Sequence, residues 1–166
     1  MKFLKLTFLI ALIAGFGLFS SCKPGPDPEP SIEEAQLKKL VKTWVLDGAT
    51  LAGVDKDADY PNFKITITGI FSPTSAGPYG YEVIGNTPAD YPTLSPWPTD
   101  KDGEWIFNDA APQTQIIRDE GTPQELIIDY TVTATSLQLI FTYTRDGTNG
   151  RISSVNGTWI MNFIPE

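Results

Sequence analysis

Apolar and polar residues alternate along most of the chain beyond residue 43, a period of two that is typical of half-buried β-strands. The clearest runs are residues 63–68 and 137–144, where large apolar side chains alternate with Lys, Gln and Thr. Eight such runs predict eight strands, at residues 44–54, 63–68, 79–84, 104–108, 114–118, 125–133, 137–144 and 158–164.

Turn-forming residues separate many of these strands. They are Asp102-Gly103, residues 120–123, Asp146-Gly147 and Asn156-Gly157, which supply positive-φ or turn-initiating positions. Short strands with short connections predict an all-β fold: an eight-stranded antiparallel meander that closes into a barrel or folds into a sandwich. We expect a barrel, because closure removes unpaired edges, and eight strands can still enclose one small ligand.

One short helix is predicted before the strands. Ser31 and Glu34 match a capping box, and a helix to about Lys42 places Leu37, Leu40, Val41 and Trp44 on one apolar stripe. The segment is short and follows a proline-rich stretch, so we expect the stripe to dock against the barrel. The alternative is a helix that lies on a membrane surface.

The first 21 residues read as an export signal. Lys2 and Lys5 precede an apolar run at residues 6–19 that is too short to span a bilayer, which takes roughly 20 residues. The sequence Leu18-Phe19-Ser20-Ser21-Cys22 resembles the lipobox of bacterial lipoproteins, which implies cleavage before Cys22 and lipid attachment to its thiol. The alternative is an ordinary secretory signal that leaves Cys22 as a free thiol.

The predicted domain organisation has three parts. Residues 1–21 are the lipoprotein signal peptide, residues 22–30 are the lipidated cysteine with a tether that holds four prolines, and residues 31–166 are the helix and barrel. This arrangement predicts an outer-membrane lipoprotein. Both the periplasmic face and the cell surface remain open as its location.

Charge and composition exclude several functions. The chain of 166 residues carries 20 acidic and 12 basic side chains and no histidine. A net charge of -8 opposes binding to nucleic acid, and the absence of histidine removes Ser-His-Asp catalysis and histidine-ligated metals. No phosphate loop, nucleophile elbow or dinucleotide fingerprint is present, so we expect neither enzymatic activity nor a cofactor.

The pattern of a short helix, Trp44 at the start of the first strand, eight strands and a final Gly157-Thr158-Trp159 strand resembles the lipocalin-like lipoproteins of Bacteroidota. The resemblance covers residues 37–164, with Lys42 where the lipocalin Gly-x-Trp signature has glycine. It implies a small apolar ligand or a partner. It also implies a basic residue packed over Trp44, for which the candidates are Arg118, Arg145 and Arg151.

A ligand site is predicted at the barrel mouth, where residues 91–98 form a proline-rich loop that carries Tyr91 and Trp97. Tyr81, Trp105 and Tyr130 are the interior aromatic residues that we expect to contribute. The alternative is that Trp97 folds back and caps the core. The predicted interior set is bulky throughout, which favours a filled barrel; it comprises Phe63, Ile65, Ile67, Tyr81, Val83, Trp105, Phe107, Leu126, Ile128, Tyr130, Leu139, Phe141, Trp159, Met161 and Phe163.

Acidic residues suggest two further kinds of site, a calcium-binding loop and the acid pair of a glycan hydrolase, and the sequence pattern argues against both. Asp55, Asp57 and Asp59 alternate as in a calcium loop, but the sixth and twelfth positions are Tyr60 and Thr66. A second partial match uses Asp100, Asp102, Gly103 and Asp109, with Pro98 at its first position. Glu82, Glu104 and Asp129 are the acids that a glycan hydrolase would use, and their alternation with apolar residues predicts that they point outward.

Three functions follow, in order of preference. The first is a non-catalytic, membrane-anchored binding protein for a small apolar or amphipathic ligand. The second is an interaction or structural module of the cell envelope with a filled barrel. The third is a carboxylate-based glycan hydrolase. An open apolar cavity of about 300 Å³ or more favours the first function over the second.

Overall fold

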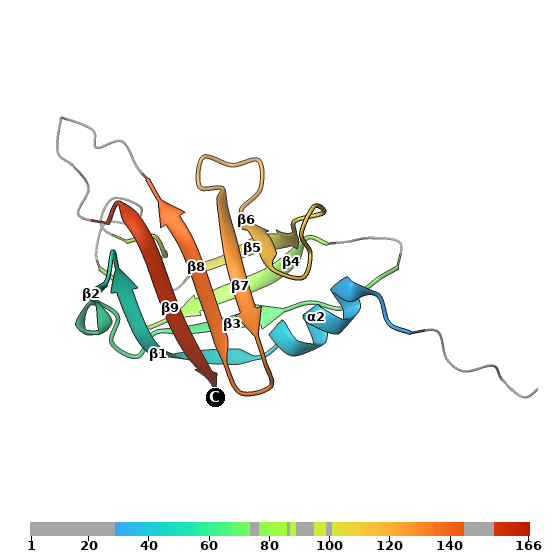
Figure 1. Ribbon diagram of the computed structural model, residues 1–166, viewed down its shortest axis with the longest axis horizontal. Coiled ribbons are helices and arrows are strands. Elements are labelled where there is room, and N and C mark those ends of the chain that lie inside the picture. Colours follow the sequence, from blue (N-terminus) through green and yellow to red (C-terminus); the bar gives the residue numbers. More distant parts are fainter. Residues whose placement is uncertain (1–28, 74–76, 86, 89–94, 99–100, 145–154) are drawn as a thin grey trace, which may run out of the picture.

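The computed structural model describes residues 29–73, 77–85, 87–88, 95–98, 101–144 and 155–166. Figure 1 shows a short helix followed by a strongly curved sheet. The elements are α2 (Ile32–Leu40), β1 (Thr43–Leu51), β2 (Val54–Asp55), the 3-10 turn η2 (Asp57–Asp59), β3 (Lys64–Thr68), β4 (Tyr79–Ile84), β5 (Lys101–Phe107), β6 (Gln115–Arg118), β7 (Leu126–Val132), β8 (Leu137–Tyr143) and β9 (Gly157–Pro165).

The sheet closes on itself. Each strand from β3 to β9 pairs antiparallel with the next, β1 pairs with β3 on one side, and β1 pairs with β9 on the other. Leu46 lies opposite Phe163 and Leu51 opposite Trp159 in the closing pair. The eight-stranded antiparallel barrel with one short helix, predicted from the alternation, is therefore confirmed. Strand β2 is a two-residue addition to the edge of β1.

The first predicted strand was too long, because the chain reverses inside it. Strand β1 ends at Leu51, and Val54 of β2 pairs back with that residue. Ala52 and Gly53 between them have φ values of 50° and 80°. A two-residue hairpin of this type needs positive φ at both central positions, and Asn-Gly is its usual signature. Ala-Gly is not a usual sequence for such a turn, so the sequence pattern did not predict it.

The turn predicted at Asp102-Gly103 is also wrong, because strand β5 begins at Lys101 and contains both residues. Gly103 lies opposite Tyr81 in the β4–β5 register. A Cβ atom at position 103 would overlap the Tyr81 ring. Gly103 therefore allows the Tyr81 side chain to pass close to the backbone of β5 and does not form a turn. The turn at residues 120–123 does connect β6 to β7, whereas Asp146-Gly147 lies outside the described residues.

The predicted interior set is confirmed, since all fifteen of those side chains are buried. Tyr60, Tyr79, Trp97, Leu137 and Tyr143 join them in one continuous core. Glu82, Glu104 and Asp129 are exposed on the outer wall, as their alternation predicted. The barrel therefore has a mostly aromatic and aliphatic interior.

Helix α2 closes one end of the barrel. The Ser31 hydroxyl accepts a hydrogen bond from the backbone N–H of Glu34 at 3.2 Å, which confirms the N-terminal cap. Leu37 and Leu40 are buried, and the Leu40 carbonyl accepts a hydrogen bond from Trp44 Nε1 at 2.9 Å. The helix lies at the end of the barrel where β7 finishes (Figure 1). It ends two residues before the predicted Lys42, and Val41 is exposed rather than buried.

Within the ranges given above, no helix has both the length and the apolar content that crossing a membrane requires.

Two buried tyrosines, Tyr79 on β4 and Tyr130 on β7, predict stability changes of opposite sign. The Tyr79 hydroxyl is buried and has no hydrogen-bond partner among the described residues, whereas Tyr130 Oη donates to the Pro112 carbonyl at 2.7 Å. We expect Tyr79→Phe to raise the free energy of unfolding by about 1 kcal/mol, because it removes an unsatisfied hydroxyl. Tyr130→Phe should lower it by about 1 kcal/mol. Urea unfolding of both variants checks the signs, and a loss in Tyr79→Phe would show that its hydroxyl has a partner.

Candidate functional site

The barrel mouth is occupied by the chain itself. Residues 95–98, here called the plug segment, come from the connection between β4 and β5 and are buried at all four positions. Trp97 is only 3% exposed. Its ring centroid lies 6.0 to 6.2 Å from those of Phe63, Tyr81 and Phe141, which belong to opposite sides of the barrel. Trp97 therefore fills the interior instead of rimming an open mouth.

Hydrogen bonds hold the plug segment in a turn. The Ser95 hydroxyl is fully buried, accepts the backbone N–H of Trp97 at 3.1 Å and lies 3.4 Å from Tyr60 Oη. Trp97 Nε1 donates to the Met161 sulfur on β9 at 3.0 Å. The polar atoms that enter the barrel with this segment thus meet partners, as burial requires.

Arg118 is the charged side chain beneath the plug segment. It is 2% exposed, and its guanidinium carbon lies 4.7 Å from the centre of the Trp97 ring. Nη1 donates to the Pro96 carbonyl at 2.8 Å and Nη2 to the Gln124 carbonyl at 3.4 Å. A buried guanidinium stacked on tryptophan gains cation-π energy that water does not weaken. Arg118 therefore joins the plug segment to the β6–β7 connection.

Asp119 provides the opposite charge. Its Oδ2 lies 3.2 Å from Arg118 Nε, although that N–H has no aligned hydrogen-bond acceptor among the described residues. The same carboxylate accepts a hydrogen bond from Tyr81 Oη at 3.0 Å. Tyr81 reaches Asp119 by crossing Gly103, which explains the glycine in β5. Trp97, Arg118, Asp119 and Tyr81 thus form one connected polar and aromatic cluster.

The space that remains in the barrel is small. Between the plug segment and the helix, the described residues enclose a cavity of about 20 Å³, lined among others by Leu40, Tyr81, Trp97, Trp105 and Arg118. A cavity of about 10–15 Å³ in this measure holds one water molecule. An open cavity of about 300 Å³, which a carrier needs, is therefore not preformed inside the barrel as the described residues outline it.

The predicted site residues divide into three groups. Tyr81, Trp97 and Trp105 meet around the small cavity. Tyr130 is buried in the wall with its hydroxyl bonded to Pro112. Cys22 and Tyr91 lie outside the described residues.

The cation over Trp44 is Lys42, whose Nζ lies 4.9 Å from the ring centre. Of the three arginine candidates for that position, Arg118 packs over Trp97, and Arg145 and Arg151 lie outside the described residues. The sequence left Arg118 as one of three open candidates for the residue over Trp44, and the structure places it over Trp97 instead. The sequence did contain a signal for the inward direction of Arg118. Side chains alternate between the two faces of β6, so Arg118 shares the inner face with Ile116, while Gln115 and Ile117 face outward.

The aspartates of the first calcium-like loop form hydrogen bonds and an ion pair within the loop and with β1. Asp57 Oδ1 accepts the Ala49 N–H, Asp55 Oδ1 accepts the Asp57 N–H, and Asp59 pairs with Lys56 Nζ at 3.0 Å. Nowhere in the described ranges do three or more potential metal ligands of the His, Cys, Asp or Glu type converge. In the second partial match, Asp100 lies outside those ranges.

Three acids of the outer wall line a shallow groove of about 530 Å³ above Gly80. Glu82 lies opposite Asp102 in the strand register, and Glu104 lies opposite Gly80. All three carboxylates are exposed to water. A glycosidase general acid is a carboxyl shielded from water, so this groove does not provide the setting that such an acid requires.

Burial of Tyr60 predicts a loss of stability at high pH. Desolvation raises the pKa of Tyr60 from 10.0 to about 12, and the hydrogen bond with Ser95 acts in the opposite direction. Above pH 10 the unfolded chain releases a proton that the folded chain keeps, so the free energy of unfolding falls. Its slope is about 1.4 kcal/mol per pH unit for one group.

Tyr60→Phe should make this alkaline slope shallower by about that amount and leave it unchanged below about pH 9. Urea unfolding from about pH 9 to about pH 11 measures both slopes. Equal alkaline slopes in the two proteins would mean that Tyr60 ionises freely in the folded state.

Comparison of the chain with protein-family models, with curated proteins and with solved structures finds no match.

Proposed function

We propose that the chain is a non-enzymatic lipoprotein of the bacterial cell envelope, anchored in the outer membrane through Cys22, whose filled barrel contacts another envelope protein. The observation that carries the proposal is the position of Trp97. With the plug segment inside, the interior holds about one water molecule, and a ligand has no preformed place there.

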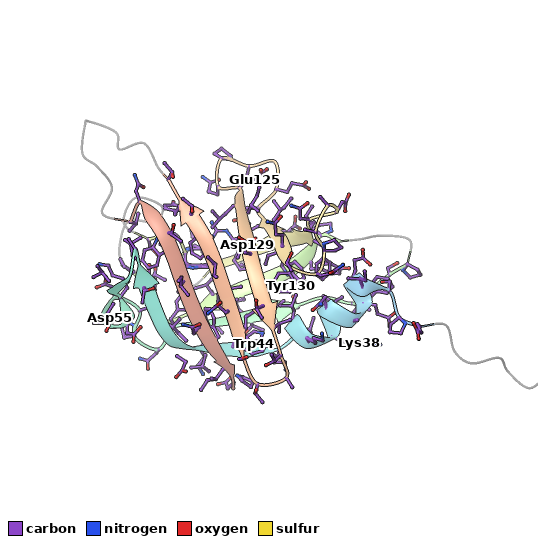
Figure 2. The ribbon with its side chains drawn as sticks, in the orientation of Figure 1. Lys38, Trp44, Asp55, Glu125, Asp129 and Tyr130 are labelled. Carbon is purple, nitrogen blue, oxygen red and sulfur yellow. The ribbon has the colours of Figure 1, made fainter. Side chains whose placement is uncertain are left out.

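The outer wall offers a surface for a protein partner. Ile106, Ile117 and Ile127 lie side by side in register on β5, β6 and β7. They face outward, and Ile127 is 52% exposed. Contiguous apolar side chains rimmed by polar residues mark protein contacts. Asp129 lies on β7 (Figure 2), two residues after Ile127, and its carboxylate accepts a hydrogen bond from Gln115 at 2.7 Å.

Titration with an environment-sensitive apolar dye tests the filled barrel. We expect no saturable dye binding by the wild-type protein and saturable binding by Trp97→Ala, in which the occupied space becomes vacant. Saturable wild-type binding that indole displaces would contradict the proposal.

A photo-crosslinking residue at position 127 in the native cell, with position 138 as the matched control on β8, tests the partner surface. The proposal expects one discrete adduct at 127.

A ligand-binding function is the second candidate, and Arg118 favours it. A small amphipathic molecule with an acidic head and a flat apolar body could replace the contacts of Pro96 and Trp97 with the guanidinium. The walls around it would be Tyr81, Trp105 and their apolar neighbours. In the same titration this function predicts that the wild-type protein binds the dye. Arg118→Lys should weaken that binding, because lysine lacks the planar guanidinium with its paired N–H donors.

A further inference from the structure

The helix end of the barrel exposes apolar side chains that the protein core does not use. Val41 is 36% exposed, and Ile70 in the connection after β3 is 91% exposed. Together with Phe71 and Leu37 they line a groove of about 370 Å³ between α2 and that connection. Here this surface is called the basal face. Because these apolar residues line one groove and are not scattered singly, they form a patch of the kind that marks a contact surface.

The basal face adjoins the point where the tether enters the domain. The chain passes from Pro30 through the Ser31 cap directly into α2. Eight residues separate Cys22 from Ser31, and a proline-rich stretch of that length spans about 25 Å in the extended polyproline II conformation. If Cys22 carries a lipid, as the proposed function holds, the basal face lies within that distance of the bilayer at all times.

Charge differs between the two ends of the barrel. At the helix end, residues 31–42 carry Lys38, Lys39 and Lys42 against Glu33 and Glu34, and Asp109 and Glu166, whose N–H donates to the Thr43 carbonyl, add negative charge there. The three lysines nevertheless gather on α2 and the residues that follow it. At the opposite end, residues 52–63 and 119–125 carry six acidic side chains and one lysine. Figure 2 shows Lys38 on the helix, and Asp55 on β2 and Glu125 before β7 away from it. Near an anionic membrane this asymmetry turns the acidic end away and brings the helix end toward the lipid.

We infer that the basal face docks on the anionic lipid surface in which the protein is anchored, with Ile70 and Val41 at the lipid interface and Lys39 near the headgroups. This inference rests on the lipid anchor of the proposed function and adds an orientation to it. The barrel then stands with its plug segment and acidic connections turned away from the membrane. The tether limits the distance, and the basal face sets which end makes contact.

The test uses the chain from residue 22 coupled through Cys22 to a maleimide lipid, so that docking is measured whether or not the cell acylates this cysteine. The vesicles contain phosphatidylethanolamine and phosphatidylglycerol with a doxyl-labelled lipid as quencher. A fluorescent amino acid replaces Ile70 in one protein and Glu120, at the acidic end, in the other. We expect quenching at position 70 and none at position 120.

Charge variants supply the matched control. Lys39→Gln should weaken the docked state about fivefold, which corresponds to about 1 kcal/mol for one basic residue at an anionic surface. Lys101→Gln, at the start of β5, should leave quenching at position 70 unchanged. Equal quenching at positions 70 and 120 would overturn the inference. Energy transfer between copies labelled at position 70, without lipid quenching, would overturn it too and assign the basal face to a second copy.

Mass spectrometry of the protein from native membranes decides the lipid anchor separately. An unmodified Cys22 would remove the anchor from the proposed function, while the coupled protein would still report whether the basal face binds lipid.

Discussion

Trp97→Ala is expected to lower the free energy of unfolding by about 3 to 5 kcal/mol, the range for removal of a large aromatic side chain from a core. The loss is large because Trp97 contacts Phe63, Tyr81 and Phe141 and carries the Arg118 guanidinium on its face. Urea unfolding followed by far-UV circular dichroism measures it, since the secondary structure reports the whole barrel.

Two controls define the cause of that loss. Trp97→Phe keeps an aromatic ring and should recover part of the stability, although it loses the bond from Nε1 to the Met161 sulfur. Added indole should stabilise Trp97→Ala in proportion to its concentration, because a ligand that binds only the folded state does so by mass action. A change below about 0.5 kcal/mol in Trp97→Ala, the size typical of a surface substitution, would place Trp97 outside the barrel.

Arg118→Ala is expected to have the second large effect, a loss of about 3 kcal/mol or more. The substitution leaves the Pro96 carbonyl without its donor and leaves the Asp119 carboxylate without its neighbouring cation. Breaking a buried charge pair from one side costs about 3 to 5 kcal/mol, and the lower end applies because the Asp119 side chain is 18% exposed. Denaturant unfolding gives the value, and Lys101→Ala on the exposed part of β5 is the control.

A double-mutant cycle separates the contact between Arg118 and Trp97 from their individual losses. The combined variant should be less destabilised than the sum of the two single variants, by about 0.5 to 3 kcal/mol. Additive losses would mean that the stacked guanidinium stabilises only the β6–β7 connection.

The fold was predictable because alternation carries most of the information in an antiparallel barrel. One face of each strand must be apolar, so Phe63, Tyr81 and Phe141 could be placed inside from the sequence alone. The failures at Ala52-Gly53 and Asp102-Gly103 have a common origin. Backbone reversal and close side-chain approach both use glycine, and a single sequence does not distinguish the two.

The site was less predictable, because it depends on where a long connection goes. The proline-rich loop was recognised, and Trp97 was given two equal interpretations, a rim contact and a core cap. The structure favours the second, since Trp97 is buried with its ring stacked on the Arg118 guanidinium. Nothing in the sequence pairs residue 97 with residue 118, because this contact follows from closure of the barrel and not from a local pattern.

The position of Trp97 inside the barrel is tested most directly by hydrogen exchange of its indole N–H, followed by NMR and assigned with Trp97→Phe. Trp44, Trp105 and Trp159 are buried and serve as internal references, since their Nε1 atoms donate to the backbone carbonyls of Leu40, Gly80 and Val155 at 2.9, 3.1 and 2.9 Å. We predict that the Trp97 signal exchanges as slowly as theirs, at a rate set by global unfolding. Exchange within seconds while the other three stay protected would show that the mouth is open, and would contradict a barrel filled by its own chain.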